Sequence, residues 1–303
     1  MNLSIIIVNW NTKRLLIDCL ASVFETVRGI DFEVWVVDNA SADGSAAAVA
    51  EKYPDAHVVR NSENIGFAAA NNLAFRKMTG WYALLLNTDT ILTENAINVL
   101  YDFMEKNPKA GMACGQLLNR NGTKQNSMAN FPSLPLLVAN ETVLRMLFPK
   151  QFPSKRREYF KPIEIDSCIG ACMIVRKKAI DQVGLLDEQY FFFFEETDWA
   201  YRMKLSGWKV WFVPMAGIYH LQGQSIGHNV PSRIMFYRSR YIYFRKWYPR
   251  IYPFLFIVIF SKLLINSLLA LLGLLFTFGL KDGFRNKLIT YIGLIGWHLK
   301  GCP

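Results

Sequence analysis

The segment Leu3-Ser-Ile-Ile-Ile-Val-Asn-Trp-Asn-Thr12 decides the fold, because a short apolar run with several β-branched residues ends abruptly in polar residues. Phe32-Glu-Val-Trp-Val-Val-Asp-Asn-Ala-Ser41 repeats this pattern. The stretch between the two has the apolar spacing of a helix. A strand, a helix and a second strand in this order form a βαβ unit, in which the two strands are parallel.

The same alternation continues along the chain. His57–Val59 and Tyr82–Leu86 are the next apolar runs, and Ala68–Met78 and Asn95–Lys106 have helical spacing. Roughly four parallel strands are therefore expected before residue 110. We predict an α/β domain with a Rossmann-like mixed sheet flanked by helices, which is an architecture typical of nucleotide binding.

Polar residues follow each of these four strands. In open α/β sheets, ligands bind beyond the carboxyl ends of the strands, so these residues lie where a site is expected. Asn, Asp and Ser are also the usual residues of turns and helix N-caps, and any one loop alone favours that explanation. Four such loops at one edge of a sheet favour a binding site instead. They are Asn9–Thr12, Asp38–Ser41, Asn61–Gly66 and Asn87–Asp89.

The middle of the chain has a different pattern. Turn residues predict a strand pair around Asn121-Gly122, and a Pro-rich stretch from Pro132 to Pro162 is a candidate for shaping an acceptor site. The apolar run Cys168–Val175 is a further predicted strand. It contains Cys168 and Cys172, whose spacing would allow metal binding. Because no second pair accompanies them, we interpret both as core residues.

Two elements are expected after the middle section. Glu195–Leu205 is predicted to be a helix closed by Gly207, and Lys209–Val213 a strand ended by Pro214. The chain contains 5 cysteines without a repeated spacing, which indicates no disulfide framework and is typical of a reducing compartment. Met1–Ser4 carries no basic residue and no signal-peptide pattern follows it, so we expect translation to begin in the cytosol.

Charge is distributed unevenly along the 303 residues. Residues 1–198 carry 20 Lys or Arg against 23 Asp or Glu, whereas residues 199–303 carry 14 against 1. An apolar stretch, Phe254–Leu280, follows a basic aromatic segment directly, and this order favours a membrane surface over nucleic acid as the partner. The basic residues of that segment are Arg233, Arg238, Arg240, Arg245, Lys246 and Arg250.

The uncharged run Leu263–Leu280 comprises 18 residues, just long enough to cross a bilayer. Lys281, Arg285 and Lys287 follow it, so positive charge flanks both ends and indicates no orientation. Three arrangements stay open: a true span, a tilted, re-entrant or interfacial helix pair with Leu288–Leu299 as its second member, and a buried amphipathic helix of a soluble core. We predict a catalytic domain at 1–225, a basic aromatic membrane-proximal segment at 226–252 and membrane-associated apolar helices at 253–303.

A series of short motifs resembles the family 2 glycosyltransferases of GT-A fold, and within them most closely the rhamnosyltransferase branch. Each motif alone is weak, but the ordered set is specific and extends over roughly residues 3–250. The motifs are Ile6–Asn11, Val36–Ser41, Asn64–Phe67 with Asn71, Leu85–Asp89, Glu195–Asp198 with Arg202, and Pro214 with His220.

The resemblance implies a site for a nucleoside-diphosphate sugar and a divalent metal, Mg²⁺ or Mn²⁺. Asp89 would bind the metal, and His220 resembles the second protein ligand, although a partly buried structural histidine is the alternative. The D-x-D pattern common in these enzymes reads Asn87-Thr-Asp89 here, and an imidazole ligand suits Mn²⁺ better than Mg²⁺, so the ion stays open. The implied donor-binding residues are Val8, Asn9, Asp38 (at the base), Asn64, Gly66, Asn71, Asn87 and Asp89.

Inversion at the anomeric carbon needs a general base on the face opposite the leaving group. Glu196 resembles that base, and Glu195 is its rival because the family usually has Glu-Asp where this chain has Glu-Glu. Asp198 and Arg202 are four residues apart and are expected to pair on one helix face, whereas Glu196 lies on another. The alternative is an acidic helix start stabilised by the helix dipole.

These residues predict the transfer of one sugar, with rhamnose from dTDP-rhamnose as the candidate donor, to a cell-surface glycan or a polyprenyl-linked acceptor. The enzyme would lie at the cytoplasmic face of the cell membrane, bound peripherally or monotopically through its C-terminal region. A sugar-phosphate nucleotidyltransferase is one alternative, but its Gly-rich phosphate loop has no counterpart in Asn9–Thr12. A processive synthase would show a Q-x-x-R-W pattern, which is absent. A non-catalytic, membrane-tethered sugar-nucleotide sensor is the remaining alternative.

Overall fold

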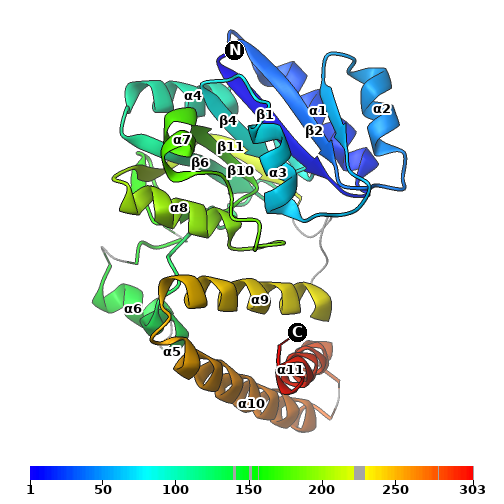
Figure 1. Cartoon of the computed structure of the whole chain (residues 1–303). Coiled ribbons are helices and arrows are strands. Elements are labelled where there is room, and N and C mark those ends of the chain that lie inside the picture. Colours follow the sequence, from blue (N-terminus) through cyan, green and yellow to red (C-terminus); the bar gives the residue numbers. More distant parts are fainter. Residues whose placement is uncertain (139–140, 150–151, 156, 222–228, 279, 303) are drawn as a thin grey trace. The chain divides into compact units, whose positions relative to one another are not determined.

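The computed structural model describes residues 1–138, 141–149, 152–155, 157–221, 229–278 and 280–302 (Figure 1). The chain divides into two compact units, which are described separately. The first unit comprises Met1–Phe131, Phe148–Phe191 and Glu195–Ser225. The second comprises Pro132–Leu147, Phe192–Phe194 and Ile226–Pro303.

A mixed sheet is the centre of the first unit. Among the described residues it has nine strands in the order β3-β2-β1-β4-β10-β6-β11-β5, with β8 also paired to β11. Its strands are β1 (Leu3–Asn9), β2 (Phe32–Asp38), β3 (His57–Arg60), β4 (Tyr82–Leu86), β5 (Thr90–Leu92), β6 (Ala110–Leu118), β8 (Ile163–Ile165), β10 (Cys172–Arg176) and β11 (Lys209–His220).

The first four strands are parallel, as the alternating pattern predicts. β1 pairs with β2 and with β4, and β2 pairs with β3. Asn9 and Asp38 are register partners at the carboxyl ends of β1 and β2, so the polar residues after these strands meet at one edge. The strands β10 and β5 run antiparallel to their neighbours, which makes the sheet mixed.

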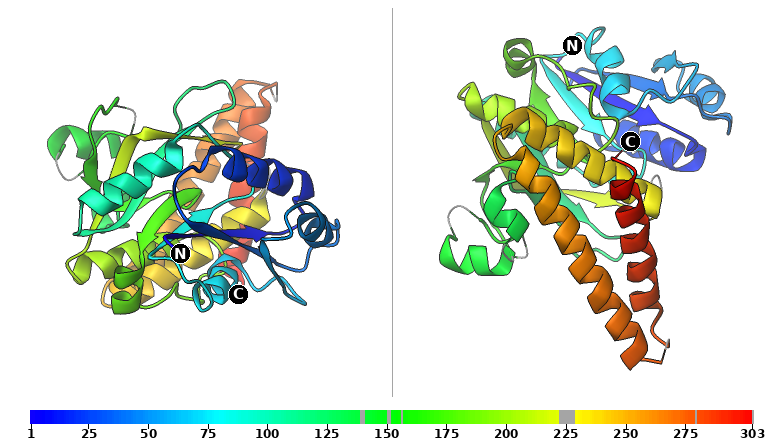
Figure 2. Two further views of the ribbon diagram at one scale, coloured as in Figure 1. Left: turned by 90° about the horizontal axis from the view of Figure 1, so that it is seen from above. Right: turned by 60° about the horizontal axis from the view of Figure 1, so that its bottom comes forward.

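Helices cover both faces of this sheet (Figures 1 and 2). Successive strand residues point to opposite faces, so Ile5 and Ile7 of β1 enter one core and Ile6 enters the other. The first core is covered by α1 (Lys13–Thr26), α2 (Ser45–Lys52) and α4 (Ala96–Lys106). The second core is covered by α3 (Phe67–Phe75), α7 (Lys177–Val183) and α8 (Glu195–Leu205).

The prediction of one strand over Cys168–Val175 is wrong. The run divides into β9 (Ser167–Cys168), which pairs with β7 (Met128–Ala129), and β10 of the main sheet. Between them the amide of Ile169 donates to the Ser127 carbonyl, and the Ala171 carbonyl accepts from Asn87. The three residues 169–171 therefore leave the strand pattern and cross between two sheets. Cys168 and Cys172 are buried free thiols, as predicted for core residues.

Two further predictions on this part of the chain need correction. Pro214 does not end a strand, because β11 continues to His220 with a register shift between Val213 and Gly217. Proline is tolerated at such a bulge, where its missing N–H breaks no ladder bond. The strand pair around Asn121-Gly122 is reduced to one bridge between Leu118 and Lys124. The helix predicted at Glu195–Leu205 has these bounds in α8.

The second unit is helical in its described residues. It contains α5 (Leu134–Val138), α6 (Glu141–Leu147), α9 (Val230–Trp247), α10 (Tyr252–Phe276) and α11 (Asp282–Leu299). Asn229 caps the N-terminus of α9, because its side chain accepts a hydrogen bond from the Ser232 amide at 3.0 Å. α10 and α11 pack against each other along their lengths (Figure 2). The second apolar helix begins at Asp282, earlier than the predicted Leu288.

Candidate active site

Asn9 and Asp38 form the first part of the site, at the carboxyl ends of β1 and β2. Asn9 Nδ2 donates to Asp38 Oδ1 at 2.9 Å, and the Ser41 amide donates to Asp38 Oδ2 at 3.2 Å. Both carboxylate oxygens of the buried Asp38 are therefore held by neutral donors, which fixes its orientation. Val8 precedes Asn9 and packs against the second core.

Asn39 joins the loops of this edge, and sequence reasoning alone does not single it out. Its Nδ2 donates to Asn64 Oδ1 at 2.8 Å and to the Gly66 carbonyl at 3.2 Å. Its Oδ1 accepts from Asn61 Nδ2 at 2.9 Å and from the Ile65 amide at 3.2 Å. Asn39 thus positions the whole segment before α3, including two predicted donor-binding residues.

Gly66 allows a close approach of two segments. Its φ is +85°, and a Cβ there would lie 2.6 Å from the Phe191 carbonyl oxygen, so only glycine fits. The next amide, of Phe67, donates to that oxygen at 2.7 Å. On α3, Asn71 Nδ2 donates to the Phe67 carbonyl, while Asn71 Oδ1 is buried and accepts no hydrogen bond from the described residues. Asn71 therefore retains one acceptor for a ligand.

Asp89 and His220 lie side by side although they are far apart in the sequence. β5 runs antiparallel to the end of β11 and pairs Thr90 with His220, and the Leu221 amide donates to the Asp89 carbonyl at 2.8 Å. Asp89 Oδ1 lies 3.5 Å from His220 Nε2. The two residues are 2% and 8% exposed. Asn87 begins this turn, and its amide donates to the Ala171 carbonyl at 2.9 Å.

Gln125 orients the imidazole of His220, and no sequence signal identifies it. Its Nε2 donates to Asn119 Oδ1 at 2.8 Å and to the His220 carbonyl at 2.7 Å, which determines how the amide is turned. Its Oε1, 3.0 Å from His220 Nδ1, must then accept a hydrogen bond from the N–H of that nitrogen. In the neutral imidazole, Nε2 consequently presents its lone pair to Asp89.

This arrangement fits a divalent metal. Asp89 Oδ1 is buried and accepts no hydrogen bond from the described residues, so two acceptor atoms face each other at 3.5 Å. Two atoms that each lie about 2.1 Å from one cation are about 3.0–3.5 Å apart. A histidine ligand that donates its other N–H to a neighbour is also typical of metal sites. The described residues contain no group of three or more His, Cys, Asp or Glu able to hold a metal, so within them Asp89 and His220 are the two candidate ligands.

Glu195 and Glu196 begin α8 and have different surroundings. Glu195 is buried, and its Oε2 accepts no hydrogen bond from the described residues. Burial, and then the charge of Glu196, raise the pKa of Glu195 well above its usual range. Glu196 is half-buried, and burial raises its pKa to about 7 despite hydrogen bonds that lower it. A carboxylate with this pKa is suited to take up a proton near neutral pH.

The loop 169–171 joins the Asp89 turn to the start of α8. The carbonyl of Ala171 in this loop accepts a hydrogen bond from the amide of Asn87, which lies two residues before Asp89. Gly170, the residue before Ala171, lies beside Glu196, since a Cβ built on Gly170 would be 3.8 Å from Glu196 Cγ. The interruption between β9 and β10 therefore brings the predicted metal ligand and the predicted base to one region.

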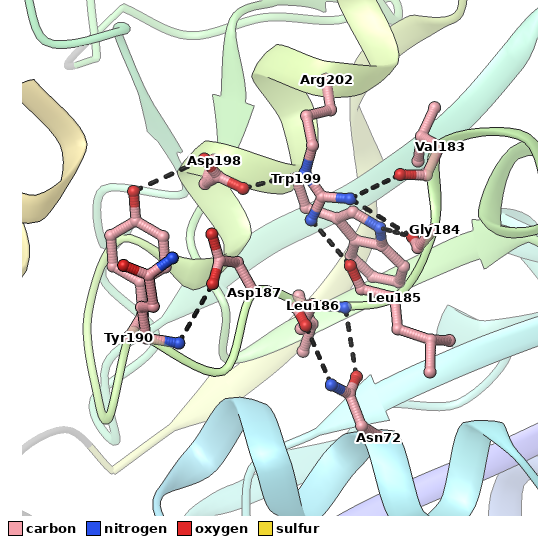
Figure 3. Close-up of polar contacts among 11 residues, drawn as sticks. Asn72, Val183, Gly184, Leu185, Leu186, Asp187, Tyr190, Asp198, Trp199 and Arg202 are labelled. Carbon is pink, nitrogen blue, oxygen red and sulfur yellow. Dashed lines mark hydrogen bonds and ion pairs between the residues drawn. The ribbon is translucent and has the colours of Figure 1, made fainter. Parts of the chain in front are cut away.

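An ion pair holds α8 in place (Figure 3). Arg202 Nε donates to Asp198 Oδ2 at 2.9 Å, so the predicted pairing of these residues is confirmed. The guanidinium also donates to the carbonyls of Val183 and Leu185, both at 2.7 Å. The side chain of Asn72 on α3 forms two hydrogen bonds with the backbone of Leu186, the residue after Leu185 (Figure 3). Asp198 and Arg202 are thus committed to structure, which leaves Glu196 available for chemistry.

A cavity of about 750 Å³ opens beside His220. Of the predicted site residues, His220 alone lines it, and two arginines give it positive charge. The volume lies within the range of about 300–1,000 Å³ that is usual for small-molecule sites. Its lining residues are Arg14, Leu15, Asp18, Asn119, Arg120, Asn121, Gln125, His220 and Leu221.

Comparison with known sequences gives the following similarities. A family model described as "Glycosyl transferase family 2" matches residues 4–184. An N-acetylglucosaminyl-diphospho-decaprenol L-rhamnosyltransferase of Mycobacterium tuberculosis is 28% identical over 226 residues, which cover 69% of this chain and 73% of that protein. A low-salt glycan biosynthesis hexosyltransferase of Haloferax volcanii is 26% identical over 212 residues, and the match covers 67% of this chain and 62% of that protein.

Two solved structures share the fold. One is a mannosyltransferase of Pyrobaculum calidifontis in complex with GDP-Man and Mn²⁺. Its TM-score with this chain is 0.60 at 18% sequence identity, and the match covers 99% of this chain and 86% of the mannosyltransferase. GalNAc-T7 with UDP, GalNAc and Mn²⁺ has a TM-score of 0.56 at 17% identity, and the match covers 73% of this chain but 44% of that one. The predicted GT-A type fold is confirmed by these similarities.

We expect Arg202→Leu to destabilise the protein strongly. The substitution leaves the Asp198 carboxylate, which is 0% exposed, without its cation and removes the bonds to three backbone carbonyls. Breaking a buried pair in this way costs about 3–5 kcal/mol of unfolding free energy. Urea unfolding would measure the loss. The matched control is Lys177→Leu, which breaks the exposed Lys177–Asp181 pair of the same i,i+4 spacing and should cost under about 1 kcal/mol. Equal losses in both variants would contradict the assigned role.

We expect Gln125→Leu to weaken Mn²⁺ binding. Without the amide oxygen, His220 no longer has a fixed tautomer with Nε2 facing Asp89. Losing such a supporting bond typically lowers metal affinity about 10–100-fold. Electron paramagnetic resonance of Mn²⁺, titrated in the presence of a nucleoside diphosphate, would measure it. Gln182→Leu is the control and should leave the affinity unchanged, because it makes the same substitution at an exposed glutamine whose Oε1 accepts from Trp208 Nε1. An unaltered affinity in Gln125→Leu would place the metal elsewhere.

Proposed function

The chain belongs to glycosyl transferase family 2, and on that premise we propose that it transfers one sugar, with inversion, from a nucleoside-diphosphate donor to a cell-surface glycan or lipid-linked acceptor. The observation that carries the proposal is the connection of the Asp89–His220 pair to Glu196 through residues 169–171. A group suited to neutralise a leaving diphosphate and a group suited to accept a proton thereby lie in one unit of the fold.

Each of these residues has a defined part in the proposed reaction. Glu196, with its pKa near 7, accepts the proton of the acceptor hydroxyl as that hydroxyl attacks the anomeric carbon. A divalent ion, Mg²⁺ or Mn²⁺, held by Asp89 and His220 would neutralise the charge that develops on the diphosphate. Asp38 faces the base of the donor, and the segment held by Asn39 lines the donor pocket with Asn71.

Rhamnose from dTDP-rhamnose is the proposed donor sugar, and a polyprenyl-diphosphate-linked sugar the proposed acceptor. The support is the similarity to the mycobacterial rhamnosyltransferase, whose name specifies an N-acetylglucosaminyl-diphospho-decaprenol acceptor. Family membership argues against the nucleotidyltransferase alternative. The sensor alternative requires donor binding without release of nucleotide, so a turnover assay separates it from an enzyme.

We also propose that the protein binds the cytoplasmic face of the cell membrane through its C-terminal region, with 1–225 as the catalytic domain, 226–252 as the membrane-proximal segment and 253–303 as the apolar helices. α10 is the one helix within the described ranges that is long and apolar enough to cross a membrane. Its exposed face is apolar, with Ile265 and Leu268 both more than half exposed. Such a surface is unfavourable in water. Basic residues at Arg245 and Lys246 precede it and suit anionic lipid headgroups.

We expect Glu196→Gln to abolish sugar transfer and to retain donor binding. The amide has nearly the same shape as the carboxylate but cannot take up a proton, and loss of a general base typically lowers the rate about 10²–10⁴-fold. Transfer from dTDP-rhamnose to a polyprenyl-diphosphate-linked sugar would be followed by nucleotide release. Donor binding would be followed by the rise in melting temperature with Mn²⁺ present.

A control variant and a pH profile test whether Glu196 is the general base. Glu188→Gln removes an exposed carboxylate that pairs with Arg76 and should leave the rate of transfer unchanged. In the wild type, kcat/KM should rise with pH through about 7, because the base acts in its ionised form and burial raises the pKa of Glu196 to about 7. Full activity in Glu196→Gln together with no activity in Glu195→Gln would assign the base to Glu195.

We expect Leu268→Glu to weaken membrane binding by about tenfold or more, since burying one leucine side chain in lipid contributes about 1.5–3 kcal/mol. Flotation with vesicles of phosphatidylcholine and phosphatidylglycerol would measure the bound fraction. Leu205→Glu is the matched control, because Leu205 is 63% exposed and Leu268 57% exposed, but Leu205 lies at the end of α8. Equal binding of Leu268→Glu and the wild type would remove α10 from the proposed membrane surface.

A further inference from the structure

The arginines of α9 have different surroundings. Arg233 and Arg238 are exposed, whereas Arg240 is half-buried, with its guanidinium carbon 5.9 Å from the centroid of the Phe236 ring. Arg240 Nε is buried and has no hydrogen-bond partner, and Arg240 forms no ion pair within the part of the chain that the structure describes. Arg240 therefore differs in its surroundings from the exposed arginines of the same helix.

A cation in such surroundings needs a counter-charge. Removing a guanidinium from water without a partner is costly, and burial lowers the pKa of Arg240 accordingly. Its neighbours Tyr237 and Tyr241 offer phenols rather than carboxylates. The sequence contains no Asp or Glu between Asp198 and Asp282. The nearby Ser239 hydroxyl already donates to the Phe192 carbonyl at 2.7 Å. No acidic side chain of this segment can neutralise the charge.

The residues around Arg240 converge as hydrogen-bond donors. Arg233, Tyr237 and Arg240 occupy positions i, i+4 and i+7 of α9, which lie on one face of a helix. Both arginines act electrostatically on the Tyr237 hydroxyl, and so does Tyr291 of α11. Guanidinium groups bind phosphate oxygens in a fixed, two-pronged geometry, and a phenol adds a further donor.

We propose that Arg240, together with Arg233 and Tyr237, binds a phosphate or diphosphate group that supplies the missing counter-charge. The group is either carried by a membrane lipid or is a free anion. The site lies wholly in the second unit and uses none of the residues assigned to the donor or the metal. It therefore stands or fails independently of the proposed sugar transfer.

The test is a binding titration of the full-length protein in neutral maltoside micelles with EDTA present. EDTA removes divalent metal, so that the Asp89–His220 pair does not retain the probe. Sodium diphosphate and farnesyl diphosphate are the two probes. We expect Arg240→Gln to weaken binding by about tenfold or more, since charge-assisted hydrogen bonds are the stronger ones. Arg233→Gln should weaken it by about threefold or more.

Two controls make the result specific. Arg238→Gln removes an equal charge from the exposed side of the same helix and should change the affinity by less than about twofold. Asp89→Asn should not change it at all. Binding of farnesyl diphosphate alone supports the site and assigns the group to a lipid, whereas equal binding of both probes supports the site and shows that a free anion suffices.

Three outcomes would overturn the proposal. They are the failure of both probes to bind the wild type, an equal loss in Arg238→Gln and Arg240→Gln, and a loss in Asp89→Asn. Folding is checked by the melting temperature of Arg240→Gln without ligand, which should not fall below that of the wild type because an unpaired cation is removed. If this variant does not fold, Arg233→Gln decides the question, because Arg233 is exposed and tolerates replacement.

Discussion

The pairing of β11 with β6 and β5 is the constraint on which the site depends. The strand runs parallel to β6 and, after the register shift between Val213 and Gly217, antiparallel to β5. Near its end β11 pairs with both strands, and His220 lies beside Asp89 at the edge where the parallel strands end. The Asp89–His220 pair is thus held by sheet hydrogen bonds, which are more rigid than a loop, and Gln125 adds a further restraint on the imidazole.

The start of α8 separates structural from chemical carboxylates. Asp198 is buried with Arg202 and links the helix to the preceding loop, whereas no cation among the described residues lowers the pKa of Glu196. The residues before the helix, Phe193 and Phe194, adopt positive φ values of 70° and 72°, which are unfavourable for bulky side chains. Such backbone persists where surrounding contacts determine it, and the Phe194 ring packs on aromatic residues of α9 within the second unit.

The second unit combines properties that a water-soluble helical bundle avoids. α10 exposes an apolar face, the sequence around the basic residues of α9 contains no Asp or Glu from residue 199 to residue 281, and Arg240 is partly withdrawn from water. A lipid surface accounts for the first property through burial of apolar area and for the second through anionic headgroups. A phosphate group on α9 accounts for the third. The three explanations are mutually consistent. At a membrane surface, lipid phosphates lie between the apolar layer that would bury α10 and the water that would surround basic residues.

Local patterns by themselves determined much of this protein. The alternation of β-branched runs with helical spacing predicted the parallel strands, and the i,i+4 spacing predicted the Asp198–Arg202 pair, because neighbours in a strand or helix are close in sequence. Tertiary structure alone decided the contacts of Asn39 and Gln125, the division of Cys168–Val175, and the burial of Arg240. Gln125 and its partner are 95 residues apart, and no local periodicity encodes such a contact. Which atoms meet is decided only when strand register and helix packing are complete.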